Sequence, residues 1–560
     1  MNWIWKAERP KKLPVLFGLM WLVVLPHLSF GQGVHMTLRA NTNPFHPPGR
    51  RYTGVVAEGN YAYVGQYAGF NGVLVFNVAN PDAPVLVTTY APKGINTLDI
   101  EYLQVSNGIG YFASGRGGGV QIVDLSDPTH PKLIRQLTSA DGAYDNVENV
   151  FIDGDHLYIP NYRNVSPAVE IWNVSDPESP FLITTVIGTD PVASHDVTVI
   201  NNRMYISGWS GHVDIWDVTD VDTEPPTLLG TFTSESHVQF SWPTSDGNYL
   251  VCPHELSTGS DVRIYDISDP ANVIQAAVLS APALGIAALT PAEAKIVNNL
   301  LYVAWDQAGL LVFDITDPTN PVMVGSYDTF PGAWNAGPFS GAWSVFPFLG
   351  QDRILYTDQK TGLYIFDATG VSSEPALYSM TASPAKVTGS KAATGQVFLV
   401  GLAQAGGFTI NLSANGPVAT NPVVVPEGAT NVVFQEATSP VAANTPVVIS
   451  ATDGTYNASA GLTLLPPVPA KLTFSPSSIV GGNNSTMTVF LNAPAAVDTS
   501  VPVTVTSGQS AIASMPPVVV SAGNSSAAVT VATNPGSCCT SVKVSATLNG
   551  TTKTSTLTVK

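Results

Sequence analysis

The chain has 560 residues, of which 44% are hydrophobic and only 11% are charged, and its formal net charge is −18. The length predicts more than one domain, and the composition excludes a disordered chain, which is poor in apolar residues and rich in charge. An acidic field repels phosphate backbones, so we expect no nucleic-acid partner and regard cations or basic surfaces as better suited.

Residues 1–31 have the layout of a secretory signal peptide. Basic residues precede an apolar run over 13–30, and small residues stand at the two positions that a signal peptidase reads, Ser29 and Gly31. The alternative is an uncleaved membrane anchor, which the shortness of the run and its two prolines disfavour. We therefore expect a mature chain that begins near Gln32, is secreted, periplasmic or at the cell surface, and has no transmembrane segment.

One short phrase then recurs seven times at steps of 44 to 53 residues. Each copy is an apolar strand that ends in one of the anchor residues Asn77, Asp124, Asn173, Asp217, Asp266, Asp314 and Asp367. Two strands precede each phrase and one follows it, which predicts a four-stranded antiparallel sheet per unit. The phrase strands are apolar on both faces, so each must lie between two other layers. Sheets packed face to face around a ring provide this, and we predict an all-β, seven-bladed β-propeller over 32–375.

The phrases resemble a known repeat. QIVDLSDPTHP at 121–131, EIWNVSDPESP at 170–180 and VFDITDPTNP at 312–321 are similar to the LVIVD repeat. The resemblance implies a bacterial or archaeal extracytoplasmic propeller and says little about activity. WD40 repeats fit less well, because a Trp-Asp pair occurs in only one unit, at 216–217, and its Gly-His partner is absent.

The ring needs a closing strand. Residues 376–383 align with the start of a later repeat, so blade seven lacks a fourth strand on its C-terminal side. The spare strand near the start is His35–Ala40. We predict that it completes blade seven.

A different repeat fills the rest of the chain, where residues 380–399 match 472–491. Two units of about ninety residues with short alternating strands suit immunoglobulin-like β-sandwiches, at 376–468 and 469–560. They resemble bacterial Ig-like domains, which implies spacer or adhesive modules. Three cysteines are too few for a disulfide framework, and the state of the adjacent pair, Cys538 and Cys539, stays open.

We assign no catalytic residues, because the common catalytic and nucleotide-binding motifs are absent. In a propeller the first strand of each blade lines the central channel. Candidate ligand-binding residues therefore stand near the start of these strands: Asp99, Glu101, Glu148, His195, Asp196, His237 and Trp343. Such carboxylates and imidazoles suit a divalent metal. The alternative, a solvated rim with structural hydrogen bonds between blades, is favoured, and no other cofactor is expected.

An uncharged aromatic segment, FPGAWNAGPFSGAWSVFPF, spans 330–348 and includes Trp334 and Trp343. One interpretation is a ligand platform on an acidic propeller. The other is a loop folded over the channel mouth.

Two functional classes remain. In the first, a non-enzymatic binding or adhesion protein recognises a protein or carbohydrate at the cell surface, or cations, and the C-terminal domains act as spacers. In the second, a hydrolase or lyase uses a metal or acid–base site in the channel. Propellers host both, and the missing catalytic motifs favour the first.

Overall fold

The computed structural model describes residues 33–44, 51–67, 72–91, 99–162, 165–235, 237–255, 261–286, 290–330 and 341–560. The expected signal peptide lies outside these residues. The described part is all-β apart from short 3-10 turns. None of its helices is long and apolar enough to cross a bilayer.

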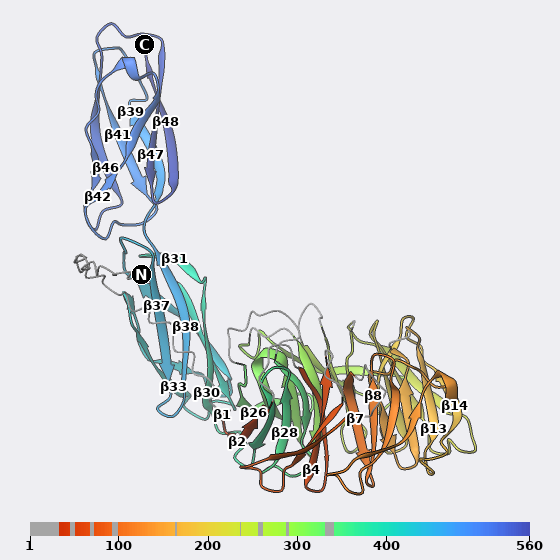
Figure 1. Cartoon of the computed structure of the whole chain (residues 1–560). Coiled ribbons are helices and arrows are strands. Elements are labelled where there is room, and N and C mark those ends of the chain that lie inside the picture. The colour runs from red at the N-terminus through yellow and green to blue at the C-terminus, as the bar shows by residue number, and fades with distance from the viewer. Residues whose placement is uncertain are drawn as a thin grey trace, which may run out of the picture.

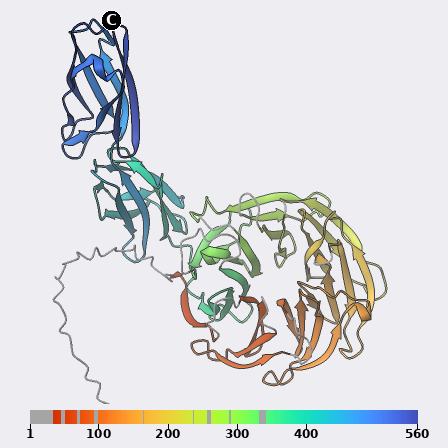
Figure 2. The same ribbon diagram turned by 45° about the horizontal axis from the view of Figure 1, so that its top comes forward.

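Seven antiparallel sheets follow one another along the first two thirds of the described chain and stand around a ring (Figure 2), consistent with the blades of a β-propeller. Blade one contains β3 (Arg51–Glu58), β4 (Tyr61–Tyr67), β5 (Val73–Asn77) and β6 (Val85–Tyr90). Blade two contains β7 (Ile100–Ser106), β8 (Ile109–Ser114), β9 (Gly119–Asp124) and β10 (Lys132–Leu137). Blade three contains β11 (Phe151–Asp153), β12 (His156–Pro160), β13 (Ala168–Asn173) and β14 (Phe181–Ile187).

The remaining blades repeat this order. Blade four contains β15 (Ser194–Ile200), β16 (Arg203–Gly208), β17 (His212–Asp217) and β18 (Thr227–Thr233). Blade five contains β19 (Trp242–Pro243), β20 (Tyr249–Pro253), β21 (Asp261–Asp266) and β22 (Ile274–Ser280). Blade six contains β23 (Pro291–Val297), β24 (Leu300–Trp305), β25 (Gly309–Asp314) and β26 (Val322–Tyr327). Blade seven contains β27 (Ala342–Phe346), β28 (Ile354–Asp358) and β29 (Gly362–Asp367).

The recurring phrase forms the third strand of every blade, as predicted. Its last residue has a role that is the same in all seven copies: the side-chain oxygen of the Asp or Asn accepts a hydrogen bond from the backbone N–H two residues later. Such a turn competes with the ladder and stops the strand. Asp or Asn is therefore required by the turn that ends each third strand.

The N-terminal segment closes the ring. Strand β2 (Thr37–Thr42) pairs antiparallel with β29 and supplies the fourth strand of blade seven, which confirms the predicted closure. The strand begins at Thr37 and not at His35, because His35 has a φ of 56° and its Nδ1 contacts the carbonyl oxygens of Val324 and Ser372 at 3.2 and 3.1 Å. The short β1 (Gly33–Val34) adds a fifth strand beside β26 of blade six.

Two further units follow the ring. The first contains β30 (Ala376–Ser383), β31 (Lys386–Thr388), β32 (Ala393–Val400), β33 (Phe408–Ala414), β34 (Val418–Ala419), β35 (Val423–Val425), β36 (Asn431–Thr438), β37 (Thr445–Thr452) and β38 (Asn457–Leu465). The second contains β39 (Pro469–Ser475), β40 (Ser478–Ile479), β41 (Asn484–Leu491), β42 (Thr499–Val501), β43 (Val503–Ser507), β44 (Ile512–Ser514), β45 (Val518–Val520), β46 (Ser526–Thr533), β47 (Thr540–Leu548) and β48 (Thr551–Val559).

The two units share one topology. The order β30-β32-β36 in the first corresponds to β39-β41-β46 in the second, and β31-β38-β37-β33 corresponds to β40-β48-β47-β43. Each unit encloses its own buried apolar core. The sequence repeat is therefore also a structural repeat, and Figure 1 shows the units end to end.

The first unit packs directly on the ring. Ala376 and Val400 belong to the same buried cluster as residues of blades five and six, and the N–H of Gly401 donates to the carbonyl of Met323 at 2.8 Å. The backbone N–H of His35 donates to the hydroxyl of Tyr456 at 3.4 Å. Figure 1 shows this unit beside β26 and β1, at the rim of the ring. The contacts fix the unit to the rim without a free linker between them.

Candidate functional site

Every blade contributes to one cavity near the ring axis, with a volume of about 310 Å³. Its walls carry four acidic side chains, Glu101, Glu148, Glu255 and Asp306, and four aromatic ones, Tyr67, Tyr162, Trp209 and Trp343. His195 and the amide side chains of Gln239 and Gln359 complete the polar part of the wall. The predicted convergence of the first strands on the axis thus produces one acidic, aromatic cavity.

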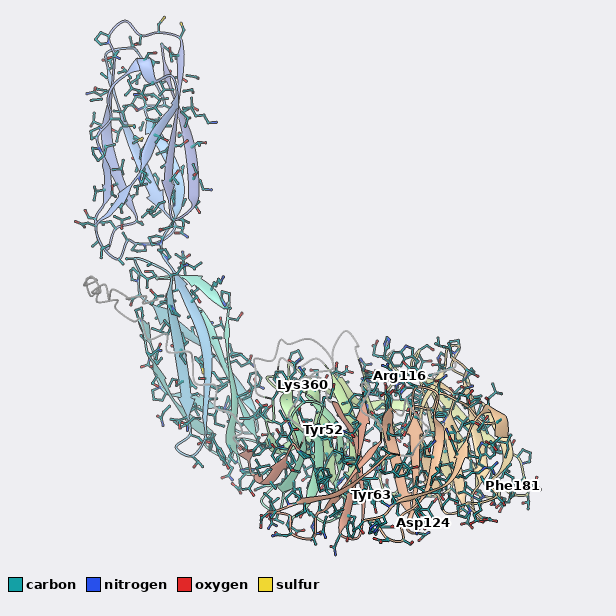
Figure 3. The ribbon with its side chains drawn as sticks, in the orientation of Figure 1. Tyr52, Tyr63, Arg116, Asp124, Phe181 and Lys360 are labelled. Atoms are coloured by element: carbon teal, nitrogen blue, oxygen red, sulfur yellow. The ribbon has the colours of Figure 1, made fainter. Side chains whose placement is uncertain are left out.

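The cavity lies toward one face of the ring. The guanidinium of Arg116 donates to the hydroxyl of the lining residue Tyr67 at 3.1 Å. Figure 3 shows Arg116 and Lys360 at this face, whereas Asp124, at a strand-ending turn, lies at the opposite face. The two faces therefore differ in role, since the phrase turns occupy one and the cavity lies toward the other.

Aromatic rings close the channel below the cavity. Tyr102 of blade two and Phe240 of blade five meet with ring centroids 5.0 Å apart, and Tyr102 also contacts the ring of Trp343 at 6.1 Å. Tyr102 and Phe240 line a second, much smaller cavity of about 20 Å³, which is close to the size of one water. The upper cavity is therefore a pocket with a floor.

Irregular strands aim several side chains into the pocket. In blades four, six and seven the ladder between the first two strands skips one residue, and the skipped residues are His195, Ala292 and Trp343. Glu101 lies in a similar interruption of blade two. A β-bulge turns its extra residue out of the regular alternation. All four of these residues line the pocket, so the bulges build its wall.

Of the predicted site residues, the pocket unites Glu101, Glu148, His195 and Trp343. Asp99 instead forms an ion pair with Arg116, 2.7 Å between Oδ2 and Nε. Two others, Asp196 and His237, lie outside the pocket wall, and the placement of Trp334 stays a prediction. Asp196 lines the lower cavity, His237 packs edge-on against Trp209 at 4.4 Å without lining the pocket, and Trp334 lies outside the described residues.

Asp196 faces away from the pocket because it follows the bulge at His195 and returns to the regular ladder, opposite Ser207. The amide of Asn149 donates to its Oδ1. Burial raises the pKa of Asp196 well above its usual range, since a carboxylate is poorly stabilised away from water. The position therefore favours a neutral carboxyl.

His195 connects two blades. Its Nδ1 lies 3.0 Å from the carbonyl oxygen of Gln239 in blade five, which assigns a proton to Nδ1 because a carbonyl only accepts. Its ring stacks on Trp209 at 5.1 Å, and its Nε2 faces Oε1 of Glu148 at 3.7 Å. The expected structural bond to a neighbouring blade is present. Among the described residues, no group of three or more His, Cys, Asp or Glu side chains is placed to hold a metal ion.

A buried ion pair lines the lower, smaller cavity. The ammonium of Lys295 lies 3.0 Å from Oε1 of Glu293. The other oxygen of Glu293 accepts from the hydroxyl of Ser344 at 2.6 Å and from the N–H of Val345 at 2.8 Å. Because Ser344 and Val345 belong to blade seven, the second carboxylate oxygen of Glu293 links blades six and seven.

The comparisons with known proteins identify the repeat. The family model described as LVIVD repeat matches residues 49–91, 103–138 and 294–329. The chain carries LVIVD repeats. The matched segments fall in blades one, two and six, so the resemblance of the phrases is confirmed there. No curated protein matches the chain.

Several solved structures are similar to the chain. The computationally designed protein Ika8 is 10% identical over 57% of this chain and 98% of its own, with a TM-score of 0.38. A putative 6-phosphogluconolactonase from Bacteroides fragilis is 12% identical over 55% and 86%, with a TM-score of 0.39. BamB from Moraxella catarrhalis is 10% identical over 56% and 84%, with a TM-score of 0.36.

Ten of the fourteen residues that line the pocket were not predicted from the sequence. Six of them end the second strand of a blade or follow it within two positions: Tyr67, Tyr162, Trp209, Glu255, Asp306 and Gln359. They stand 8 to 11 residues before the Asp or Asn that ends the phrase of the same blade. That offset is the sequence signal that would have found them.

Four buried polar atoms of the pocket residues have no hydrogen-bond partner among the described residues. They are Oε1 of Gln239, Oε1 of Gln359, Oγ1 of Thr290 and Nε1 of Trp343. Burying such atoms unpaired costs about 1–3 kcal/mol each, and such exceptions call for a functional explanation. Because all four residues line the same cavity, these atoms can bond to whatever fills it.

Proposed function

We propose that the chain is a secreted or cell-surface binding protein. In this proposal a seven-bladed LVIVD propeller is the recognition module, and the two C-terminal units are immunoglobulin-like spacers. The observation that carries it is the pocket to which every blade contributes, with acidic and aromatic walls and a closed floor. A concave, mostly preformed cavity with a few convergent polar groups is typical of a ligand site.

The spacer role is supported by the shape and position of the C-terminal units. Each has about ninety residues in mainly antiparallel sheets, with one parallel pair at β31–β38 or β40–β48, a size and layout that suit an immunoglobulin-like sandwich. Figure 1 shows them in line, leading away from the ring. The direct packing of the first unit on blades five and six would hold the propeller in one orientation on this stalk. The expected export signal at residues 1–31 agrees with a surface location.

A hydrolase or lyase is the second candidate, and one observation favours it. His195 and Glu148 face each other in the pocket, 3.7 Å between Nε2 and Oε1. This distance exceeds that of a hydrogen bond, but catalytic pairs often shorten only when substrate binds. Against it, His195 is held by the backbone of Gln239 and by stacking on Trp209, which suits a structural imidazole.

The test compares three purified chains that begin at residue 33: the wild type, Trp343→Ala in the pocket and Phe181→Ala. Phe181 is an exposed aromatic residue on the outer strand of blade three, far from the pocket (Figure 3), and serves as the matched control. Binding is measured on immobilised bacterial envelopes, extracellular proteins and glycans.

We expect saturable binding by the wild type and by Phe181→Ala, and loss of binding by Trp343→Ala, with the target recovered chemically unchanged. Binding that survives Trp343→Ala, or a wild type that binds none of these surfaces, would refute the proposal. Turnover of the target that depends on His195 would establish the second candidate instead.

A further inference from the structure

We propose that the pocket takes a neutral polyhydroxylated ligand, namely a terminal sugar unit of a glycan. This inference rests on the proposed binding function and names its ligand class. The volume of about 310 Å³ lies at the small end of the range for ligand pockets, which suits about one or two pyranose rings.

The unpartnered atoms decide between ligand chemistries. The indole Nε1 of Trp343 only donates, the hydroxyl of Thr290 donates or accepts, and the amides of Gln239 and Gln359 offer either an oxygen or an NH2 group. A simple cation would engage acceptors alone, and a simple anion would engage donors alone. Hydroxyl groups both donate and accept, so a polyol can form a hydrogen bond with every one of these atoms. The three polar residues other than Trp343 are each more than nine-tenths buried.

Aromatic side chains stand on two sides of the pocket. Trp343 and Tyr67, from blades seven and one, lie with centroids 6.1 Å apart. Trp209 and Tyr162, from blades four and three, lie 5.2 Å apart. The face of an aromatic ring is electron-rich, and the C–H-bearing face of a pyranose is its electropositive, apolar counterpart. Aromatic side chains that a sugar ring can contact therefore line both walls.

The acidic side chains complete the match. Glu101, Glu148, Glu255 and Asp306 are all buried and line the same cavity. An ionised carboxylate is an acceptor with two oxygens, and hydrogen bonds from a neutral donor to a charged acceptor are stronger than bonds between neutral groups. Adjacent sugar hydroxyls supply donors at the spacing of those oxygens. An organic ammonium group also binds carboxylates, but it offers no acceptor for the indole N–H of Trp343.

The variant that tests this is Gln359→Leu. Oε1 of Gln359 has no hydrogen-bond partner within the described residues, and the residue is 2% exposed. Replacing a buried amide whose oxygen is unpaired by an apolar group of similar size should leave the melting temperature equal or higher. A loss of binding without a loss of stability is then specific to a ligand contact. Gln435→Leu, at an exposed position of β36, is the matched control.

The experiment applies the chain beginning at residue 33 to an array of neutral, acidic and amino glycans, with simple alkylammonium salts as competitors. We expect neutral glycans to bind, Gln359→Leu to weaken the binding by about tenfold or more, equal to about 1.4 kcal/mol, and Gln435→Leu and the salts to change nothing. Binding of charged glycans alone, displacement by alkylammonium, or undiminished binding by Gln359→Leu would overturn the inference.

The outcomes also separate the two proposals. If no glycan on the array binds but the chain binds a protein surface in a Trp343-dependent way, the proposed sugar ligand is wrong and the proposed binding function remains. If the chain binds neither a glycan on the array nor any other surface, the sugar ligand and the binding function are both wrong.

Discussion

Oδ1 of Asp124 accepts a hydrogen bond of 2.9 Å from the N–H of Ser126. The same contact ends the third strand of every blade, and in blades one and three Asn77 and Asn173 make it at 3.0 and 3.1 Å. Asp124→Asn should therefore preserve the turn, because the amide oxygen accepts equally. Asp124→Ala should lower the free energy of unfolding by about 1 kcal/mol. Urea unfolding of the three proteins measures this, and equal midpoints for Asn and Ala would contradict the role of the turn.

Strand β2 closes the ring, so its removal should destabilise the chain. A chain that begins at residue 43 lacks β2 and β1, including the buried side chains of Val34 and Met36. We expect it to lose at least about 3 kcal/mol of stability, since burying each such side chain contributes about 1.5–3 kcal/mol. We also expect it to aggregate through the uncovered edge of β29.

Thermal unfolding and light scattering, compared with a chain that begins at residue 33, measure both effects. A synthetic peptide of residues 33–42 added to the shortened chain should restore part of the lost stability. A shortened chain that remains monomeric with an unchanged melting temperature would show that the ring closes without β2.

Glu170 provides a pH-dependent prediction. Burial raises the pKa of Glu170 to about 7 from the ordinary 4.5, and the indole of Trp172 donates to it at 2.9 Å. The folded chain therefore binds this proton more tightly than the unfolded chain does. The contribution of this proton to the free energy of unfolding is fully present below about pH 4.5 and is lost as the pH rises to about 7. Over this range the free energy of unfolding falls by at most about 1.4 kcal/mol per pH unit.

Glu170→Gln removes the titration while keeping an acceptor for Trp172. The variant should be more stable than the wild type at pH 8, and the difference should narrow toward pH 5. Urea midpoints measured across this range give the difference directly. A difference that is constant with pH would mean that Glu170 does not titrate in this window.

The repeated parts of the fold could be predicted from the sequence because each repeat contains the residues that start and end its own strands. The strand-ending Asp or Asn, the apolar faces of β9 and β25, and the absence of a fourth strand after β29 can all be read locally. The order of the strands in each blade and the closure of the ring followed from these features.

The pocket could be predicted only in part. The first strands pointed to Glu148 and His195, but the bulge that aims Trp343 inward is set by pairing with β28 and has no local signature. The residues after the second strands, such as Trp209 and Asp306, lie in loops of varying length, so their convergence depends on the closed ring. The packing of Ala376 and Val400 on blades five and six likewise depends on contacts between units.

His195 provides a test of the link between blades four and five. His195→Ala leaves the carbonyl of Gln239 without its 3.0 Å contact, and a buried acceptor left unpaired costs about 1–3 kcal/mol. We expect a folded variant with a lower unfolding midpoint. His130→Ala is the control, because His130 is exposed and contacts only its own turn. Equal midpoints for His195→Ala and the wild type would show that the imidazole is not structural.

The central claim is that the propeller pocket, and no other surface of the chain, holds the ligand. The most direct measurement is a crystal structure of the chain with the smallest glycan that the wild type binds. The account predicts density for one sugar ring between Trp343 and Trp209, within hydrogen-bond distance of Gln359 and Gln239. Density on the C-terminal units or on the opposite face of the ring, with the pocket filled only by water, would contradict it.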